Sequence, residues 1–347
     1  MPSTVHHQLE KASFSRRHFA RILGGLAGLQ YPAPQWAQGE ASSFDFSLLA
    51  DWITSNPMFF IRHHGDPPIE TSESRTLSIE GEVSRKYTLQ YEELVRQPPK
   101  TVVTTIECVE NPIGGGLVST AEWTGTKLRE ILERAEPLSS ARFVRLHGSD
   151  SYARTVPLSK ASHPDTLLAY RMNGDDLPSA HGRPLRAVIP GWYGMDSVKW
   201  LRKVELTAED FDQDYLLQSG TRSAEPITAM QIKAAFARPL DGAVIFGHGF
   251  VVRGAAWAGE DSVERVELSV DGMRSWQQAR LLDRPELYAW VRWQWDWQIP
   301  APGSYELALR ATDSRGRIQP LERNPNRLDS YGQNSCQKVR VTVVWPK

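Results

Sequence analysis

Residues 105–116 carry the side chains of this sequence whose types and spacing suit metal chemistry. The segment contains Glu107, Cys108 and, three residues later, Asn111. The β-branched residues at 101–105 predict a strand, and the Asn-Pro pair and three glycines that follow must end regular structure. Cys108 therefore lies where a strand opens into a loop. A thiolate there is a soft ligand, which favours copper, zinc or iron clusters over magnesium or calcium.

Two other roles for Cys108 stay open at this point. A buried structural cysteine behaves as a small hydrophobic residue. The chain has one further cysteine, Cys336, so a disulfide is possible in an oxidising compartment. We favour a free Cys108, because it lies in its own Gly-rich loop while Cys336 directly precedes a strand-like stretch. No CxxC pair, CxxCH haem motif or zinc spacing occurs, so an electron partner would be a separate protein.

A second group of chemically suited residues lies between 168 and 201. His181, Arg186 and Lys199 are separated by short strand and turn pieces rich in Gly and Pro. Such pieces let backbone N–H groups and cations converge on a phosphate-bearing ligand. The segment is neither a Walker loop nor a dinucleotide fingerprint, since GK[ST] and GxGxxG are both absent.

The third group is Phe-Phe-Ile-Arg-His-His at residues 59–64. Its residue types fit either a strand that leaves the core for a polar loop or an anion site. Arg62 suits the second reading, because the planar fork of donors on an arginine holds a tetrahedral oxyanion in one orientation.

These three segments together resemble the sulfite-oxidase family of molybdopterin enzymes. Glu-Cys-x-x-Asn at 107–111 is similar to the family's metal-ligand segment, and the resemblance implies that Cys108 binds molybdenum. His-Gly-x-Pro-x-Arg at 181–186, followed by Pro-Gly-x-x-Gly-x-x-Ser-Val-Lys-Trp at 190–200, resembles the family's pterin-phosphate signature. The implied cofactor is molybdenum-molybdopterin.

The resemblance also implies a role for individual residues. Arg62, Cys108 and Tyr215 would be catalytic, with Tyr215 hydrogen-bonding beside the metal and helping to move a proton. From residue types alone, Tyr215 is a surface tyrosine and Asp150 caps a turn. The implied cofactor-binding residues are Phe60, Ile61, Arg62, His63, His64, Asp150, His181, Arg186, Ser197, Val198 and Lys199.

The chain departs from the family at a few of these positions. His63 stands where the family usually has Asn. Pro112 and Ile113 stand where many members have basic or glycine residues, which removes positive charge near the metal and puts the substrate in doubt. Cys336 and Gln337 lie where Trp and a polar residue are common.

At 347 residues the chain exceeds the usual size of one hydrophobic core, so we expect two domains. Period-two stretches at 77–83, 143–146 and 152–158 predict strands, and 128–135 has helical spacing. Short strands recur between 223 and 347, which predicts an all-β sandwich. The predicted class is α+β, with a sulfite-oxidase-type molybdopterin domain at 45–222 and an immunoglobulin-like domain at 223–347. In the family that second domain mediates dimerisation, which implies a homodimer.

The tryptophans of the second part have their own pattern. Trp293, Trp295 and Trp297 alternate along one predicted strand, so their rings share one face of a sheet. Such rings usually form core.

The N-terminus has the pattern of a twin-arginine export signal. Arg16 and Arg17 precede a modest apolar run at 20–29, which is too short to span a bilayer. We expect a signal peptide at 1–37, a periplasmic mature protein and no integral membrane segment. The alternative is the basic tail of a cytoplasmic protein. With 40 basic and 41 acidic residues, the composition gives no reason to expect nucleic acid as a partner.

The expected function is two-electron oxygen-atom transfer in the periplasm. The enzyme would oxidise sulfite or a related sulfur compound and pass the electrons to a separate c-type cytochrome. Two alternatives remain: a molybdenum-dependent reductase of sulfoxides or similar oxides, and a cofactor-free periplasmic binding protein.

Overall fold

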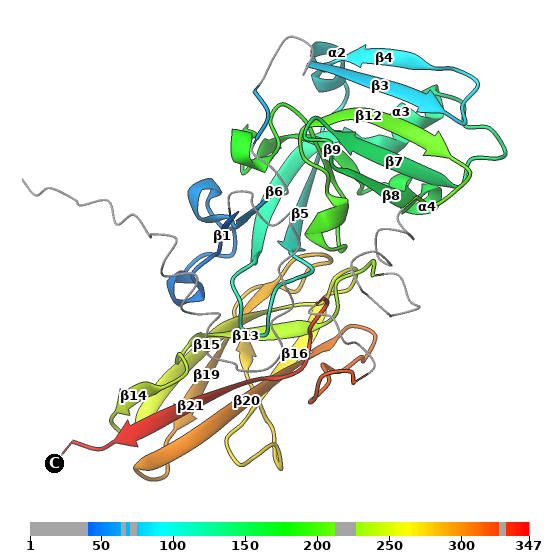
Figure 1. Cartoon of the computed structure of the whole chain (residues 1–347). Coiled ribbons are helices and arrows are strands. Elements are labelled where there is room, and N and C mark those ends of the chain that lie inside the picture. Colours follow the sequence, from blue (N-terminus) through cyan, green and yellow to red (C-terminus); the bar gives the residue numbers. More distant parts are fainter. Residues whose placement is uncertain (1–40, 64–66, 70–74, 212–226, 326–330, 347) are drawn as a thin grey trace, which may run out of the picture. The chain divides into compact units, whose positions relative to one another are not determined.

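The computed structural model describes residues 41–63, 67–69, 75–211, 227–325 and 331–346 (Figure 1). The twin-arginine segment, His64 and Tyr215 lie outside these residues. We call residues 41–211 the first half and residues 227–346 the second half.

A five-stranded sheet in the first half carries the cysteine. Its strands run in the order β10, β9, β6, β5, and β11 also pairs with β9. Their bounds are β5 (Lys100–Glu107), β6 (Val118–Lys127), β9 (Leu167–Met172), β10 (Asp175–Asp176) and β11 (Arg186–Val188). The register of β5 on β6 pairs Thr101 with Thr124 and Glu107 with Val118. The predicted β-branched strand is therefore confirmed, and it ends at the residue before Cys108.

A second five-stranded sheet in the first half has the order β4, β3, β12, β7, β8. Its strands are β3 (Thr76–Gly81), β4 (Tyr87–Gln90), β7 (Phe143–Gly148), β8 (Ala153–Pro157) and β12 (Leu201–Thr207). Three short helices accompany the sheets: α2 (Tyr91–Val95), α3 (Leu128–Arg134) and α4 (Leu158–Ala161). The apolar side of α3 enters the core through Leu128, Ile131 and Leu132, as its helical spacing predicts.

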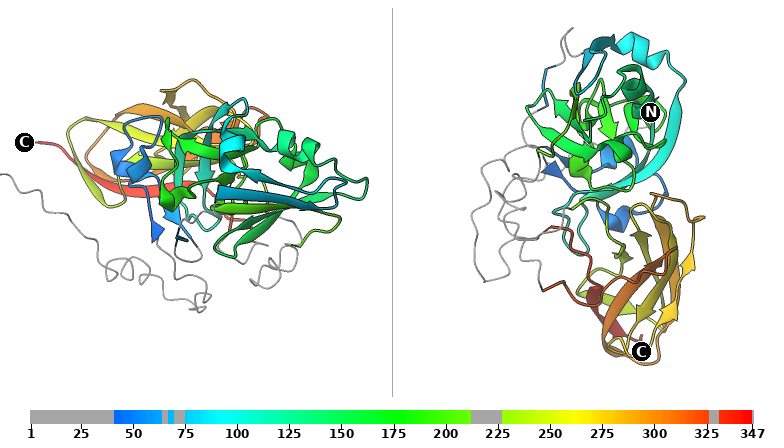
Figure 2. Two further views of the ribbon diagram at one scale, coloured as in Figure 1. Left: turned by 90° about the horizontal axis from the view of Figure 1, so that it is seen from above. Right: turned by 90° about the vertical axis from the view of Figure 1, so that its right-hand side faces the viewer.

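The second half is the predicted all-β sandwich, which Figure 2 shows from two further directions. One sheet has the order β13, β15, β19, β18 and the other β14, β21, β20, β16, β17. The first contains β13 (Lys233–Arg238), β15 (Gly249–Trp257), β18 (Arg280–Leu281) and β19 (Val291–Gln298). The second contains β14 (Ala243–Phe246), β16 (Val263–Ser269), β17 (Gln277–Gln278), β20 (Gly303–Asp313) and β21 (Gln337–Val344).

The core of the sandwich depends on the alternating tryptophans of β19. Trp293, Trp295 and Trp297 are 0%, 8% and 2% exposed, so all three rings face inward, as predicted. The α+β class holds with strands predominating, since the described helices are few and short.

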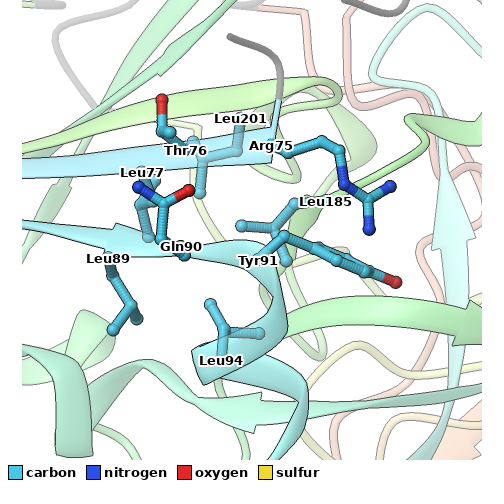
Figure 3. Close-up of a pocket in the computed structure, with 9 residues that line it drawn as sticks. All are labelled: Arg75, Thr76, Leu77, Leu89, Gln90, Tyr91, Leu94, Leu185 and Leu201. Atoms are coloured by element: carbon cyan, nitrogen blue, oxygen red, sulfur yellow. The ribbon is translucent and has the colours of Figure 1, made fainter. Parts of the chain in front are cut away.

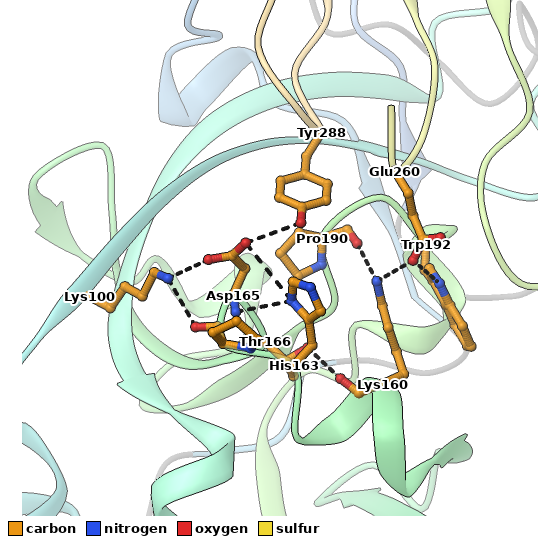
Figure 4. A network of polar contacts seen from close by, with 10 residues as sticks. Lys100, Lys160, His163, Asp165, Thr166, Pro190, Trp192, Glu260 and Tyr288 are labelled. Carbon is orange, nitrogen blue, oxygen red and sulfur yellow. Dashed lines mark hydrogen bonds and ion pairs between the residues drawn. The ribbon is translucent and has the colours of Figure 1, made fainter. Parts of the chain in front are cut away.

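The two halves share a hydrophobic core in addition to their own. That shared cluster combines Val109 and Val118, from either side of the cysteine loop, with Trp257 and Trp290 of the second half. A separate polar network also joins the halves (Figure 4). In it, Lys160 Nζ lies 2.6 Å from Glu260 Oε1, and Tyr288 Oη donates to Asp165 Oδ2 at 3.1 Å.

A small pocket lies where β3, β4 and α2 meet (Figure 3). Leucines form much of its wall, and Arg75 lies over the ring of Tyr91 at 4.6 Å. None of the expected cofactor residues lines it.

The helices in the described part of the chain are too short or too polar to cross a membrane.

Candidate functional site

Cys108 is the first residue after β5, and its backbone N–H and carbonyl are both hydrogen-bonded to residues of the loop that follows. Its N–H donates to Leu117 O at 2.9 Å, and its carbonyl accepts from Asn111 N at 2.9 Å. The Asn111 side chain closes the loop, because its amide donates to Glu107 Oε1 at 2.9 Å and its oxygen accepts from Leu117 N at 3.0 Å. An asparagine three residues after the cysteine thus holds the two ends of the loop together.

Gly116 lets the chain pack closely against this loop. Its carbonyl accepts from Phe44 N at 2.7 Å, and a Cβ at this position would lie 1.9 Å from Phe44 O. Any larger residue would push the N-terminal segment away from the cysteine loop.

The Cys108 thiol lies in a poorly solvated and acidic environment. Burial raises its pKa to about 12, and the nearby carboxylates of Glu110 and Glu107 also raise it. Without a bound cation, the group is therefore a neutral thiol at physiological pH. A metal ion changes this, because a coordinating thiol is deprotonated outright. Both cysteines are free thiols, so the disulfide between Cys108 and Cys336 is not formed.

Arg62 reaches the cysteine loop from another segment of the chain. It lies in the short strand β2 (Ile61–Arg62), which pairs with β1 (Ala41–Ser42). Its guanidinium makes an ion pair with Glu110 at 2.9 Å, and both side chains are about one quarter exposed. Arg62, the cation expected to bind the substrate, thus lies beside the cysteine loop. The carboxylate of Glu110 already compensates its charge.

The carbonyl of Ala180 joins the segment at 168–201 to the segment at 59–64. It accepts from Lys199 Nζ at 2.9 Å and from His63 Nε2 at 2.9 Å. Lys199 also donates to Arg62 O at 3.4 Å. Segments 60–63 and 180–199, which are more than a hundred residues apart in sequence, therefore meet in the fold.

Arg186 is a fully buried cation at the base of this region. Its side chain is 2% exposed and donates to His181 O at 3.1 Å and Ser197 O at 3.0 Å. It also lies over the ring of Trp123 at 4.7 Å. Burial lowers its pKa to about 9, so it stays charged at neutral pH. Within the described residues its hydrogen bonds go to carbonyls and not to a carboxylate, which leaves a net positive charge for an anion.

His63 and His181 present two imidazole nitrogens without a partner in the described part of the chain. Burial, with Lys199 as the next cause, lowers the pKa of His63 to about 4 and that of His181 to about 3. Both rings are therefore neutral. Nε2 of His63 must donate to the Ala180 carbonyl, so its Nδ1 is a buried acceptor, and Nδ1 of His181 is likewise unsatisfied.

Gly182 brings the cationic residues together. It has φ +110°, and a Cβ there would lie 3.0 Å from the Cβ atoms of both Arg186 and Lys199. Only glycine accepts this backbone conformation and contact without strain.

These observations fit a phosphate-bearing pterin. Buried cations suit its phosphate, and unsatisfied imidazole acceptors suit the N–H groups of its ring system. The described residues hold no cluster of three or more His, Cys, Asp or Glu side chains that could bind a metal by themselves.

The remaining expected residues have supporting contacts. Phe60 is 6% exposed and its N–H donates to Ser119 Oγ at 3.2 Å, while Ile61 belongs to β2. Ser197 Oγ accepts from Ile189 N at 3.1 Å. The side chain of Val198 is in the apolar core, so only its backbone is available to a cofactor.

Asp150 shows the turn-capping contact expected from its residue type. Its Oδ1 accepts from Tyr152 N at 3.2 Å. The backbone N–H of the preceding residue, Ser149, donates to Trp200 O at 2.9 Å, so Asp150 lies near Lys199 in the fold. Its contact with a pterin stays a prediction.

Sequence reasoning missed several side chains that contact the cysteine loop. Glu110 is one of them, and a charged residue two positions after a candidate ligand is a usable signal. Lys233 of the second half donates to Glu107 Oε1 at 2.7 Å, and Trp257 donates to Glu107 Oε2 at 2.8 Å. Lys233 stands in an apolar strand pattern, Ile-Lys-Ala-Ala-Phe, where an exposed lysine would look the same.

Two family models match the chain in succession. The model described as oxidoreductase molybdopterin binding domain matches residues 64–215. The model described as Mo-co oxidoreductase dimerisation domain matches residues 224–343.

Several characterised proteins are similar to the chain. Sulfite oxidase of Gallus gallus is 33% identical over 318 residues, covering 79% of this chain and 69% of that protein. Mitochondrial sulfite oxidase of Mus musculus is 31% identical over 342 residues, covering 86% and 63%. The chain thus spans about two thirds of these relatives. Nitrate reductase [NADPH] of Aspergillus niger is 29% identical, covering 78% of this chain and 39% of that protein.

A solved structure has the same fold over nearly the whole chain. The sulfane dehydrogenase SoxCD from Paracoccus pantotrophus superposes with a TM-score of 0.80 and 23% identity, covering 97% of this chain and 92% of that chain. At this identity the likeness concerns the fold alone.

The neutral state of His63 predicts a specific loss of stability in acid. The folded-state pKa lies below the unfolded value of 6.5, so the unfolded chain binds a proton first as pH falls. The contribution of the neutral His63 to the free energy of unfolding is fully present above pH 6.5 and is lost as pH falls towards 4. In urea unfolding at pH 7 and pH 5, His63→Asn should lose less stability than the wild type, by on the order of 1 kcal/mol. Equal losses in the two proteins would contradict a neutral, buried His63.

Proposed function

The chain belongs to the sulfite-oxidase family of molybdopterin-dependent oxidoreductases, and on this premise we propose that it oxidises sulfite or a related small sulfur compound by two-electron oxygen-atom transfer. The observation that carries the proposal is the convergence of three separate segments around Cys108. The pair Arg62–Glu110 links segment 60–63 to the cysteine loop, and Lys199 links it to the cationic segment.

Each group has a defined task in this proposal. Cys108 would be the single protein ligand of the metal, and its thiolate would form on binding. Arg186, Lys199 and the unsatisfied nitrogens of His63 and His181 would hold the pterin and its phosphate. When bound, the molybdenum cofactor supplies the two-electron oxygen-atom chemistry. Tyr215, which lies outside the described residues, would hydrogen-bond beside the metal and help to move a proton.

Arg62 would orient the oxyanion of the substrate, but Glu110 limits its strength. The carboxylate lies 2.9 Å from the guanidinium, so the pair is close to neutral as seen by an incoming dianion. Pro112 and Ile113 add no compensating cation. This observation favours a second candidate function, the reduction of a neutral sulfoxide, which needs no net positive charge for binding.

The cellular setting of the reaction is also a proposal. The twin arginines at 16–17 and the short apolar run after them support export to the periplasm. A separate c-type cytochrome would then take up the electrons. The match to a dimerisation domain at 224–343 supports a homodimer.

Cys108→Ser should abolish turnover and leave the fold intact, because a hydroxyl is a far weaker ligand than a thiolate for this metal. Turnover with sulfite and far-ultraviolet circular dichroism would be measured on the same preparation. Cys336→Ser is the matched control, since it removes the other free thiol. Full activity in Cys108→Ser would remove the metal assignment.

Lys199→Ala should lower molybdenum occupancy, because it deletes a half-buried cation from the proposed phosphate site. The loss should correspond to about 1.5–3 kcal/mol of cofactor binding, the range for hydrogen bonds to charged groups. Arg186→Ala should act in the same direction. Lys203, four residues along, pairs with Glu80 and Glu205 instead. Lys203→Ala should therefore keep wild-type occupancy in elemental analysis, and equal occupancy in all three variants would refute the phosphate site.

Glu110→Gln should strengthen the binding of sulfite by freeing Arg62. Removing a charge about 6 Å from a dianion, at an effective dielectric near 20, changes the energy by on the order of 3 kcal/mol per unit charge before screening. Even half of this lowers KM for sulfite about tenfold. Salt should reduce the effect. KM for a neutral sulfoxide, assayed with a reduced dye, should change little. An unchanged KM for sulfite would mean that Arg62 does not face the substrate.

A further inference from the structure

Lys233 is a cation of the second half that is buried against the cysteine loop of the first. It is the first residue of β13 and is 2% exposed. Its ammonium donates to Glu107 Oε1 at 2.7 Å and to Asn111 O at 3.0 Å. A single side chain thus binds the residue before Cys108 and the residue three positions after it.

Glu107 is held from several directions. Its carboxylate is 1% exposed and accepts from Lys233, from Trp257 Nε1 at 2.8 Å and from Asn111 Nδ2 at 2.9 Å. Trp257 is fully buried in β15. Lys233 and Trp257 both belong to the second half, so two of the three donors come from outside the sheet that carries the cysteine.

The C-terminal segment adds a backbone bond to the same loop. Gly332 N donates to Val109 O at 2.8 Å. Glu107, Val109 and Asn111 are thus each bonded to the second half, and Glu110 pairs with Arg62.

Stability alone does not account for a buried ion pair at this place. Removing two charges from water carries a desolvation cost that their attraction often only matches, so apolar residues of similar volume would stabilise the fold as well. The pair of Lys233 and Glu107 instead restrains the conformation of the cysteine loop, because the two side chains can meet in only one arrangement of that loop.

We propose that Lys233 is a positioning residue for Cys108. Through Glu107 and Asn111 it fixes the backbone on both sides of the cysteine, and so the direction in which Sγ meets the metal. The dimerisation domain thereby sets the geometry of the metal ligand, in addition to any role in assembly. The inference deepens the proposed function and rests on Cys108 being the metal ligand.

The first test needs no cofactor and no activity. Full-length protein made in a host that lacks the cofactor is treated with iodoacetamide, and mass spectrometry of peptides gives the labelling rate at each cysteine. In Lys233→Met, labelling of Cys108 should rise about tenfold, the factor expected for one lost hydrogen bond to a charged group. Labelling of Cys336 should stay the same. Lys233→Arg keeps the charge and should restore a slow rate at Cys108.

Lys233→Met leaves Glu107 buried without its cation and could unfold the protein. The double variant Glu107→Gln with Lys233→Met avoids this, because a glutamine oxygen still accepts from Trp257 or Asn111. Trp257→Phe is a further variant, which removes one donor and no charge. Each should raise labelling of Cys108 if the restraint is real.

Lys160→Met is the matched control. Lys160 is also a buried lysine whose ion pair joins the two halves, and its bonds go to Glu260 and Pro190 O (Figure 4). Neither partner belongs to the cysteine loop. This variant should leave the labelling of Cys108 at the wild-type rate.

The second test uses the holoenzyme and a spectroscopic signature. The Mo(V) electron paramagnetic resonance signal should shift in Lys233→Met, in the double variant Glu107→Gln with Lys233→Met and in Trp257→Phe, where these fold, and remain unchanged in Lys160→Met. Unchanged labelling and an unchanged signal in these folded variants would overturn the proposal. So would an equal effect of Lys160→Met, which would mean that contact between the halves, and not Lys233, matters. Absence of molybdenum from the purified protein would contradict the proposed function. The labelling result would still decide whether Lys233 restrains Cys108.

Discussion

A carboxylate that is shielded from water requires hydrogen-bond donors, and Glu107 obtains them from three places in the chain. Asn111 donates from within the cysteine loop, and Lys233 and Trp257 donate from the second half. Because Glu107 precedes Cys108, this requirement also determines where the cysteine lies. The loop is therefore placed at the contact between the two halves, where the shared core with Val109 and Trp290 supports it.

Charge is distributed unevenly around the candidate site. Carboxylates gather at the cysteine, where Glu107 and Glu110 raise the pKa of the thiol in addition to the effect of burial. Cations gather at the other motif, where Arg186 and Lys199 lie beside two neutral imidazoles. Arg62 and Lys233 pair with these carboxylates, so what distinguishes the site is a thiol at one end and buried cations at the other. A ligand that carries a metal at one end and a phosphate at the other matches this arrangement. A simple anion would match only the second part.

The segments that form the candidate site could be proposed from the sequence, because the motifs that resemble the family are local. The cysteine follows a β-branched strand, and the segments at 59–64 and 181–200 carry residues whose chemistry and order are distinctive. The described members of those segments meet in the fold. The tryptophan alternation in β19 likewise predicted the inward face of the sandwich.

The contacts that restrain the loop could not be predicted in the same way. Lys233 and Glu107 are 126 residues apart, and nothing local distinguishes a buried lysine in a strand from an exposed one. Strand β15 carries little alternating signal in the sequence, because Gly249 and Gly254 interrupt its pattern. Gly254 is needed there, since a Cβ would lie 2.4 Å from the ring of Trp293. Such requirements arise from tertiary packing and leave no periodic signal.

The central claim is that the chain holds a molybdenum-pterin cofactor through Cys108 and the cationic motif. The most direct measurement is the molybdenum and pterin content of full-length wild-type protein purified from a host that makes the cofactor. The account predicts molybdenum and pterin in equal amounts, approaching one of each per chain. A folded protein that contains neither would contradict it and would favour a cofactor-free binding protein.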